Sequence, residues 1–241
     1  MSLVWLPFTT FAVKIDLPML KTIFSADQMP RLYLLILGIL FAVGTVGIVM
    51  PIHPYFHLLT PLNLATCAWL LLRSHNGDSD ARFLMALAVA ALGGFFIEVL
   101  GVATQWPFGA YRYGETLGPH LFDVPVMMAV NWLTSIYCTA CVANALLPER
   151  LWPVRALIGG ALMCALDVVM EPVAVKLDFW TWMQPNEGLL IAPLQNYIAW
   201  FVVSVLIHLV FQKMLPRLQN IVGIGLFVLQ FVFFGILLLL L

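Results

Sequence analysis

Seven long apolar stretches run through this chain, and they leave few choices for its fold. They cover residues 31–50, 55–72, 83–105, 121–147, 152–175, 192–214 and 221–241. A helix needs about 20 apolar residues to cross a hydrocarbon core that is about 30 Å thick. A backbone in lipid must also satisfy its own hydrogen bonds, which a helix does within one segment. The sequence therefore predicts an all-α integral membrane protein, a single bundle of about seven transmembrane helices.

The composition is typical of the same class. Of the 241 residues, 63% are hydrophobic and 10% are charged, whereas a soluble domain carries about 25% charged residues. We divide the chain into an interfacial N-terminal segment, 1–30, and a polytopic helical domain, 31–241. The formal net charge of −1 argues against a nucleic-acid partner, and membrane lipid is the expected environment.

The basic residues predict the orientation of the bundle. Most of them flank the apolar stretches on one side: Lys14, Lys21, Arg31, Arg73, Arg82, Arg150, Arg155, Lys213 and Arg217. The other side has Arg112 and Lys176. Because cytoplasmic loops carry the excess of Lys and Arg, we expect a multi-pass protein of the cell (inner) membrane. Its N-terminus would lie in the cytoplasm and its C-terminus outside.

Three carboxylates, Glu98, Asp167 and Glu171, lie inside the apolar stretches. A carboxylate near the middle of a bilayer costs roughly 2.5–3.5 kcal/mol on insertion scales, so it is a functional candidate by default. Asp167 and Glu171 are four residues apart and share one face of a helix. Burial and a like-charged neighbour favour the neutral carboxyl group, so we expect some of these acids to be protonated. A protonated carboxyl group in an apolar pocket can act as a general acid.

Two connections on the outer side, 105–125 and 176–188, are rich in aromatic residues, glycine and proline. One explanation is an aromatic belt at the membrane interface. The other is a pair of compact loops over a cavity, because Gly109, Gly114 and Gly118 permit sharp turns. We expect aromatic-rich capping loops on one side of the bundle. Polar residues within the apolar stretches also have two explanations, a binding site or hydrogen bonds between helices.

The pattern of acids and aromatic rings suits one kind of chemistry. The chain has no GxGxxG, no Walker loop, no HExxH and no His-rich metal spacing, so we expect no metal and no organic cofactor. An acid can protonate a trisubstituted double bond, and aromatic faces stabilise the cation that results. Water then adds, or a second double bond attacks. From these residues alone, hydration and cyclisation both stay open.

Two motifs resemble the signature of a known family. The first is EVLGVATQWPFGAYRY at residues 98–113, with Leu117-Gly-Pro119 and Val124-Pro125 after it. The second is DVVMEP at 167–172, with WTW at 180–182 and NYIAW at 196–200. The stretch from about 94 to 200 is similar to the CruF-type carotenoid biosynthesis membrane proteins. These are the carotenoid 1,2-hydratases, or bisanhydrobacterioruberin hydratase family.

The resemblance implies a substrate and a reaction. Water would add across the terminal C1–C2 double bond of an acyclic (ψ-end) carotenoid. We expect Glu171 or Asp167 to donate the proton and Glu98 to hold the water, with Asp123 and Asp178 relaying protons at the mouth of the site. Residues expected to bind or line the substrate are Trp106, Phe108, Tyr111, Arg112, Asn131, Trp132, Trp180, Trp182, Asn196 and Trp200. Arg112 is also expected to pair with one acid.

Other functions stay open from the sequence. A proton-coupled transporter or a lipid carrier would use the same buried acids to bind and release protons. A carotenoid end-group cyclase would share the protonation step and differ in the access of water. The sequence also leaves open a homo-oligomer or an assembly with other enzymes of the carotenoid pathway. The cysteines Cys67, Cys138, Cys141 and Cys164 are expected to be small packing residues.

Overall fold

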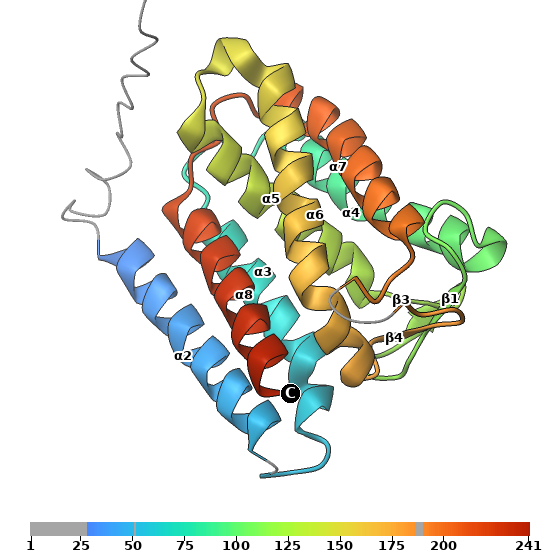
Figure 1. Cartoon of the computed structure of the whole chain (residues 1–241). Coiled ribbons are helices and arrows are strands. Elements are labelled where there is room, and N and C mark those ends of the chain that lie inside the picture. The colour runs from blue at the N-terminus through green and yellow to red at the C-terminus, as the bar shows by residue number, and fades with distance from the viewer. Residues whose placement is uncertain (1–27, 51, 187–189) are drawn as a thin grey trace, which may run out of the picture.

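The computed structural model describes residues 28–50, 52–186 and 190–241, and this part of the chain is mainly helical (Figure 1). Its α-helices are α2 (Met29–Val49), α3 (Thr60–Arg73), α4 (Ala81–Thr104), α5 (Met127–Leu146), α6 (Trp152–Lys176), α7 (Leu194–Met214) and α8 (Ile221–Leu240). Two short 3-10 helices, η1 (Phe56–Leu59) and η2 (Glu149–Leu151), precede α3 and α6. The interfacial segment predicted for 1–30 lies outside the described residues, apart from its last three.

Five of the described helices, α2, α4, α6, α7 and α8, are long and apolar enough to cross a membrane. Helix α3 has 14 residues. Helix α5 has 20 residues but includes Asn131 and Asn144 among them, and such polar side chains lower its hydropathy. The prediction of an all-α membrane protein is therefore confirmed at this level. The crossing of a membrane by α3 and α5 stays a prediction.

Each predicted apolar stretch contains one α-helix, but two stretches begin well before their helix. The second, 55–72, includes the 3-10 helix η1 before α3. The fourth stretch was predicted to begin at 121, but α5 begins at Met127. The residues before it form a tight antiparallel pair, β2 (His120–Leu121) with β3 (Val124–Pro125). In α6 the helix continues through Pro172 to Lys176. The loss of one backbone hydrogen bond at a proline is thus tolerated near the helix end.

Helices α5 and α6 lie at the centre of the bundle, and α2 lies at its edge against α8 (Figure 1). Trp132, Ile136 and Tyr137 of α5 are fully buried. A Cβ atom on Gly94 of α4 would lie 2.1 Å from Cγ of Trp132. Glycine at this position therefore lets α4 pack directly against the indole of α5.

The two aromatic connections meet at one end of the bundle and form a small sheet. Strand β1 (Tyr111–Tyr113) pairs antiparallel with β4 (Trp180–Trp182), so that Tyr111 faces Trp182 and Tyr113 faces Trp180. Successive side chains of a strand point to opposite faces. All four rings therefore share one face of the sheet. This pairing joins the loops that the sequence indicated as separate caps.

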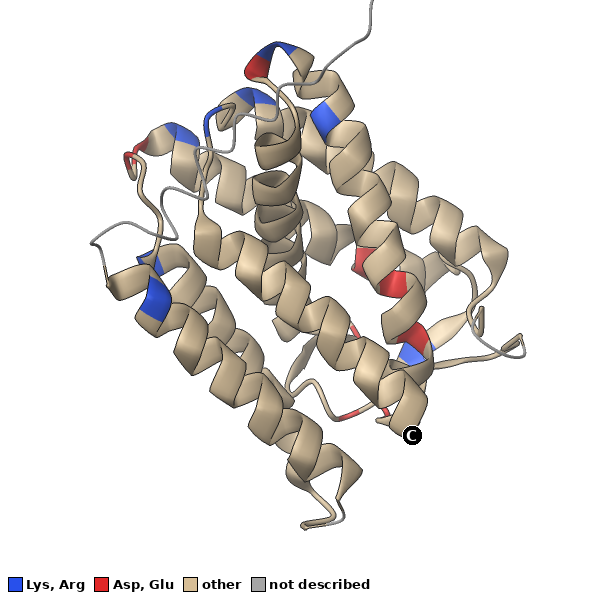
Figure 2. Ribbon diagram, turned by 60° about the vertical axis from the view of Figure 1, so that its left-hand side comes forward, with Lys and Arg blue, Asp and Glu red and all other residues tan. Residues whose placement is uncertain are grey.

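Charged residues are divided between the two ends of the helices. Figure 2 shows most Lys and Arg at one end of the bundle, whereas acidic residues inside the helices lie toward the other end. The described basic residues predicted for one side, from Arg31 to Arg217, belong to helix ends and turns at this shared end. We call it the basic end and the opposite one the acid end. Which end faces the cytoplasm stays a prediction.

Candidate active site

The three predicted acids of the helices come together at the acid end, beneath the β1–β4 sheet. Glu98 of α4 and Glu171 of α6 line the same small cavity. Asp167 lies one helical turn before Glu171, and Asn196 of α7 joins the two. The exposed fractions of the three acids are 2%, 1% and 0% for Glu98, Glu171 and Asp167. Three helices distant in the sequence, α4, α6 and α7, thus build one buried polar layer.

The carboxylate of Glu98 accepts three hydrogen bonds from aromatic side chains. Its Oε2 accepts from the hydroxyl of Tyr111 at 2.6 Å and from that of Tyr113 at 2.8 Å. Its Oε1 accepts from the indole N–H of Trp132 at 3.0 Å. Such donors fix the orientation of a carboxylate and stabilise negative charge on it.

Glu171 and Asp167 share a donor. The side-chain amide of Asn196 donates to Oδ2 of Asp167 at 2.9 Å and to Oε1 of Glu171 at 3.3 Å. The indole N–H groups of Trp180 and Trp182 donate to Oε2 of Glu171, at 3.0 and 2.8 Å. The remaining oxygen of Asp167, Oδ1, is buried without a hydrogen-bond partner among the described residues. Two carboxyl groups therefore lie close together, and one oxygen is free to carry a proton.

Aromatic rings form the walls of the acid cavity. The indoles of Trp132 and Trp200 stack with centroids 4.6 Å apart and an interplanar angle of 14°. Phe108 and Tyr111 meet edge to face at 6.2 Å, and Trp182 is tilted over Tyr111 at 5.2 Å. The cavity has a volume of about 10 Å³, close to the room that one water molecule needs.

The two tyrosines of β1 are neutral donors to Glu98. Burial raises the pKa of Tyr111 and of Tyr113 well above the usual value, and the nearby charge of Glu98 raises both further. A tyrosine whose pKa is raised keeps its proton over the whole physiological range. Both hydroxyls can therefore donate a hydrogen bond whenever Glu98 is ionised.

Most predicted substrate-binding residues lie in this layer. Phe108, Tyr111, Trp180, Trp182, Asn196 and Trp200 line the acid cavity, and Trp132 contacts Glu98 and Trp200. Asn131 lines a larger neighbouring cavity instead.

Besides Asn131, four predicted residues lie outside this buried layer. Trp106 is 64% exposed. Asp123 and Asp178 are exposed loop residues with φ of 62° and 55°. Arg112 points to the exposed face of β1, and the ion pair found in the described part of the chain joins other residues. The expected proton relay and the expected pairing of Arg112 with an acid have no contact to support them here.

Two residues of the site were not predicted. Tyr113 donates to Glu98, and Met128 lines the acid cavity. The signal for Tyr113 was present, because residues i and i+2 of an extended segment share a face with each other and Tyr111 was already a candidate. Met128 gave no such signal, since a methionine at the start of an apolar stretch looks like any other packing residue.

The described cysteines are free, and three of the four are buried. This agrees with their expected role in packing. Within residues 28–50, 52–186 and 190–241, no group of three or more His, Cys, Asp or Glu side chains is placed to hold a metal ion.

Comparison with known proteins gives a family and a relative. Residues 53–240 match the family described as carotenoid biosynthesis protein. A bisanhydrobacterioruberin hydratase from Haloarcula japonica is 35% identical over 125 residues, which are 50% of this chain and 42% of the relative. The match thus spans less than half the length of that relative. No solved structure matches the chain significantly.

Proposed function

Because this chain belongs to the carotenoid biosynthesis protein family, we propose that it adds water to the terminal C1–C2 double bond of an acyclic carotenoid. One observation carries the proposal: Glu98 and Glu171, from different helices, line one buried cavity with aromatic walls. Two carboxyl groups at one site can divide the roles of proton donor and proton acceptor. The relative from Haloarcula japonica is named a hydratase, which supports the same class of reaction.

The surroundings of the acids suggest their roles. Asp167 and Glu171 share the donor Asn196, and two carboxyl groups this close in a buried site favour holding one proton between them. Glu171 lines the cavity, so we assign it as the group that delivers the proton. Glu98 has three neutral donors and no carboxyl group among its hydrogen-bond partners. We assign it as the ionised base.

The reaction then proceeds in balanced steps. The proton of the Asp167–Glu171 pair moves to C2 of the carotenoid, and the electron pair of the C1–C2 double bond forms the new C–H bond. A tertiary cation is left at C1. A water molecule held by Glu98 attacks C1 and gives its proton to that carboxylate. Glu98 then releases this proton to water and the Asp167–Glu171 pair takes one up, so both groups return to their starting state and the net change is the addition of one water.

The aromatic walls of the acid cavity can stabilise the carbocation by cation–π attraction, because bulk water is excluded there. The face of an indole or phenol ring attracts positive charge, and the attraction is about 2 kcal/mol or more when the site is desolvated. Trp180, Trp182 and Trp200 all line the cavity. The indole N–H groups of Trp180 and Trp182 point to Glu171, so they also stabilise the carboxylate after it has released its proton.

The test is expression in a host that accumulates lycopene, with pigments analysed by chromatography and mass spectrometry. We expect a new, more polar pigment that is heavier by one water. It should be absent with Glu98→Gln and with Glu171→Gln. Glu149→Gln is the matched control, because Glu149 is a surface residue that pairs with Arg217 at the basic end.

Each other outcome has a defined meaning. A product of unchanged mass and altered spectrum would replace hydration by cyclisation of the end group. An unchanged pigment profile, with wild-type protein verified in the membrane, would contradict the proposal for this substrate. Loss of product with Glu149→Gln as well would show that the effect of the acid variants is not specific to the cavity.

We further propose that all seven helices cross the membrane, with the basic end in the cytoplasm. The basic residues at one end support this orientation, and α3 and α5 share the bundle with five helices long and apolar enough to span. A reporter fused after Leu241 should be active only on the outer side. A reporter active in the cytoplasm would contradict this proposed topology.

A further inference from the structure

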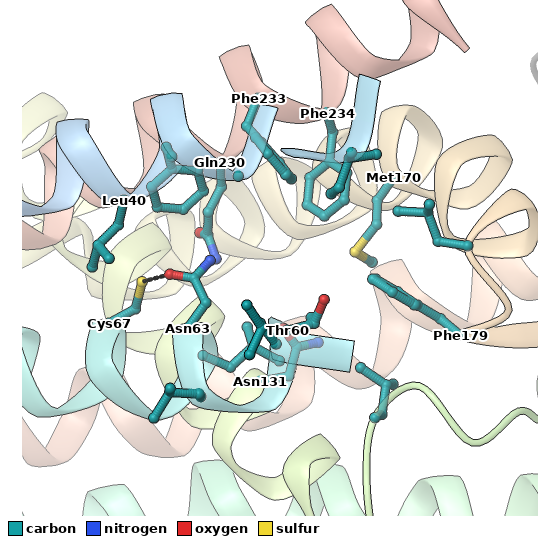
Figure 3. Close-up of a pocket in the computed structure, with 18 of the residues that line it drawn as sticks. Leu40, Thr60, Asn63, Cys67, Asn131, Met170, Phe179, Gln230, Phe233 and Phe234 are labelled. Carbon is teal, nitrogen blue, oxygen red and sulfur yellow. Dashed lines mark hydrogen bonds between the residues drawn. The ribbon is translucent and has the colours of Figure 1, made fainter. Parts of the chain in front are cut away.

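A second and larger cavity lies beside the acid cavity, with walls from α2, α3, α5, α6 and α8 (Figure 3). Its volume is about 300 Å³, which is at the lower end of the range for ligand pockets, about 300–1,000 Å³. Most of its lining is apolar, and Figure 3 shows the rings of Phe179, Phe233 and Phe234 around it. We call this cavity the apolar groove. Its composition suits a hydrocarbon ligand.

The apolar groove shares a wall with the acid cavity. Met128 and Trp180 line both. The indole N–H of Trp180 donates to Glu171 at 3.0 Å. A molecule in the groove would therefore contact the same ring that holds the proposed proton donor.

The apolar groove is also open toward the surroundings of the bundle. Val43 of α2, Leu59 of η1 and Leu62 of α3 line it, and they are 53%, 53% and 66% exposed. In a membrane, exposed apolar side chains on a helix face lipid. A ligand dissolved in the bilayer could thus reach the groove sideways, between α2 and α3.

We propose that the apolar groove binds the polyene chain of the carotenoid, whose end group reaches past Trp180 and Met128 into the acid cavity. The inference rests on the proposed function and adds the place where the substrate lies. The acid cavity has room for about one water, so the long body of the substrate must lie elsewhere. Met128 has a flexible side chain and is the wall residue that would move to admit the end group.

Two glycines of α2 provide a matched test. Gly44 lines the groove, and a Cβ atom there would lie 3.4 Å from the ring of Phe233. A Cβ atom on Gly38 would meet nothing within 4 Å. Gly44→Phe therefore fills the groove, whereas Gly38→Phe adds the same ring to the same helix on an open face.

Two readouts separate binding from turnover. The first is the hydrated pigment formed in the lycopene-accumulating host. The second is the carotenoid that co-purifies with the Glu171→Gln protein, because this variant is expected to bind without reacting. We expect Gly44→Phe to lower both by about tenfold or more, since overpacking of a binding site has effects of this size. Gly38→Phe should leave both within about twofold, as is usual for surface changes.

The outcomes distinguish this inference from the proposed function. If hydrated pigment forms normally with Gly44→Phe, the binding of the polyene in the apolar groove is contradicted. The proposed hydratase activity is not affected by that result. If wild-type protein makes no hydrated pigment, but carotenoid co-purifies and is lost with Gly44→Phe, carotenoid binding in the groove is supported and the hydratase activity is contradicted. If phospholipid alone co-purifies and Gly44→Phe does not change its amount, carotenoid binding in the groove is contradicted.

If the Gly44→Phe protein does not accumulate in the membrane, a second pair of variants tests the same inference. Leu62→Trp enlarges an exposed residue at the mouth of the groove, and Leu84→Trp is its control on α4, where Leu84 is 60% exposed. Leu62→Trp should lower both readouts and Leu84→Trp should not. Equal values for the two tryptophan variants would contradict the inference.

Discussion

Both ends of the bundle bury polar side chains, but the hydrogen-bond partners of these side chains differ between the two ends. At the basic end, the guanidinium of Arg155 donates to backbone carbonyls, at 2.6 Å to Leu147 and at 2.6 Å to Pro216. The side-chain oxygen of Asn220 accepts from backbone N–H groups at the start of α8. At the acid end, Glu98 and Glu171 accept only from side chains of tyrosine, tryptophan and asparagine.

This difference indicates which buried polar groups hold the fold and which can act on a ligand. Arg155 is 5% exposed and ties the α5–α6 turn to the α7–α8 turn, so its donors are already engaged by the backbone. The acids lie around a cavity, and one oxygen of Asp167 has no partner in the described structure. Changes at the acid end should therefore affect reaction rate, and changes at the basic end should affect stability.

The largest effect should come from Glu171→Gln. It keeps the shape of the side chain and removes the proton donor, and general acids contribute about 10²- to 10⁴-fold to rate. We expect a loss of about 1,000-fold in the initial rate of hydration in membranes. Folding should be retained, as measured by fluorescence-detected size-exclusion chromatography.

Asp167→Asn sharpens this prediction. Asp167 contacts Asn196 but does not line the acid cavity, so we expect a smaller loss, about tenfold. If Asp167→Asn instead loses as much rate as Glu171→Gln, the two carboxyl groups act as one unit and the assignment of the donor to Glu171 is wrong.

The sequence predicted the helices well because their signal is local. A run of apolar residues gives each helix by itself. The start of α5 was wrong because the β2–β3 pair is also built from apolar residues such as Leu121 and Val124. Hydropathy does not separate such a tight hairpin from the helix that follows it.

The sequence predicted the three acids within the helices that the structure brings together, but it also proposed Asp123 and Asp178, which are exposed, and it predicted only part of the walls. The spacing of Asp167 and Glu171 places both on one helix face, and this needs no tertiary information. The pairing of β1 with β4 joins two short segments from different loops, and three residues carry no signal for such a contact. For the same reason the sequence could not tell Trp182, which binds Glu171, from Trp106, which is exposed.

The second largest effect should come from Arg155→Leu at the basic end, and it should be on the free energy of unfolding. Arg155→Leu removes donors to the carbonyls of Leu147 and Pro216 and leaves these oxygens buried. Hydrogen bonds from charged groups contribute about 1.5–3 kcal/mol each, so we expect a loss of about 3 kcal/mol in the free energy of unfolding. Thermal melting in detergent should show this, with Arg150→Leu as the control because Arg150 is exposed.

The rate of hydration per folded molecule should stay unchanged in Arg155→Leu. If the rate falls by the same factor as in the acid variants while the melting temperature is normal, the basic end takes part in turnover. The assignment of reaction rate to the acid end and of stability to the basic end would then be wrong.

A smaller effect on rate should follow Trp182→Phe. The ring is kept in the wall of the cavity, and one N–H donor to Glu171, at 2.8 Å, is removed. A hydrogen bond to a charged group contributes about 1.5–3 kcal/mol, which corresponds to a loss of roughly ten- to 100-fold. Trp69→Phe is the matched control, because Trp69 is 60% exposed on α3. A loss shared by both variants would assign the effect to the membrane environment of the rings.

The smallest effect should come from Asp80→Ala. The carboxylate of Asp80 accepts from the backbone N–H of Phe83 at 2.9 Å, and so caps α4. Loss of such a cap costs about 1 kcal/mol, which lowers the melting temperature of a chain of this size by about 2–4 °C. Asn76→Ala in the exposed loop before α4 is the control. Because Asp80 lies at the end far from the acid cavity, the rate of hydration per folded molecule should not change. A slower reaction at an unchanged melting temperature would mean that the capped end of α4 affects the chemistry, and that the two ends of the bundle are coupled.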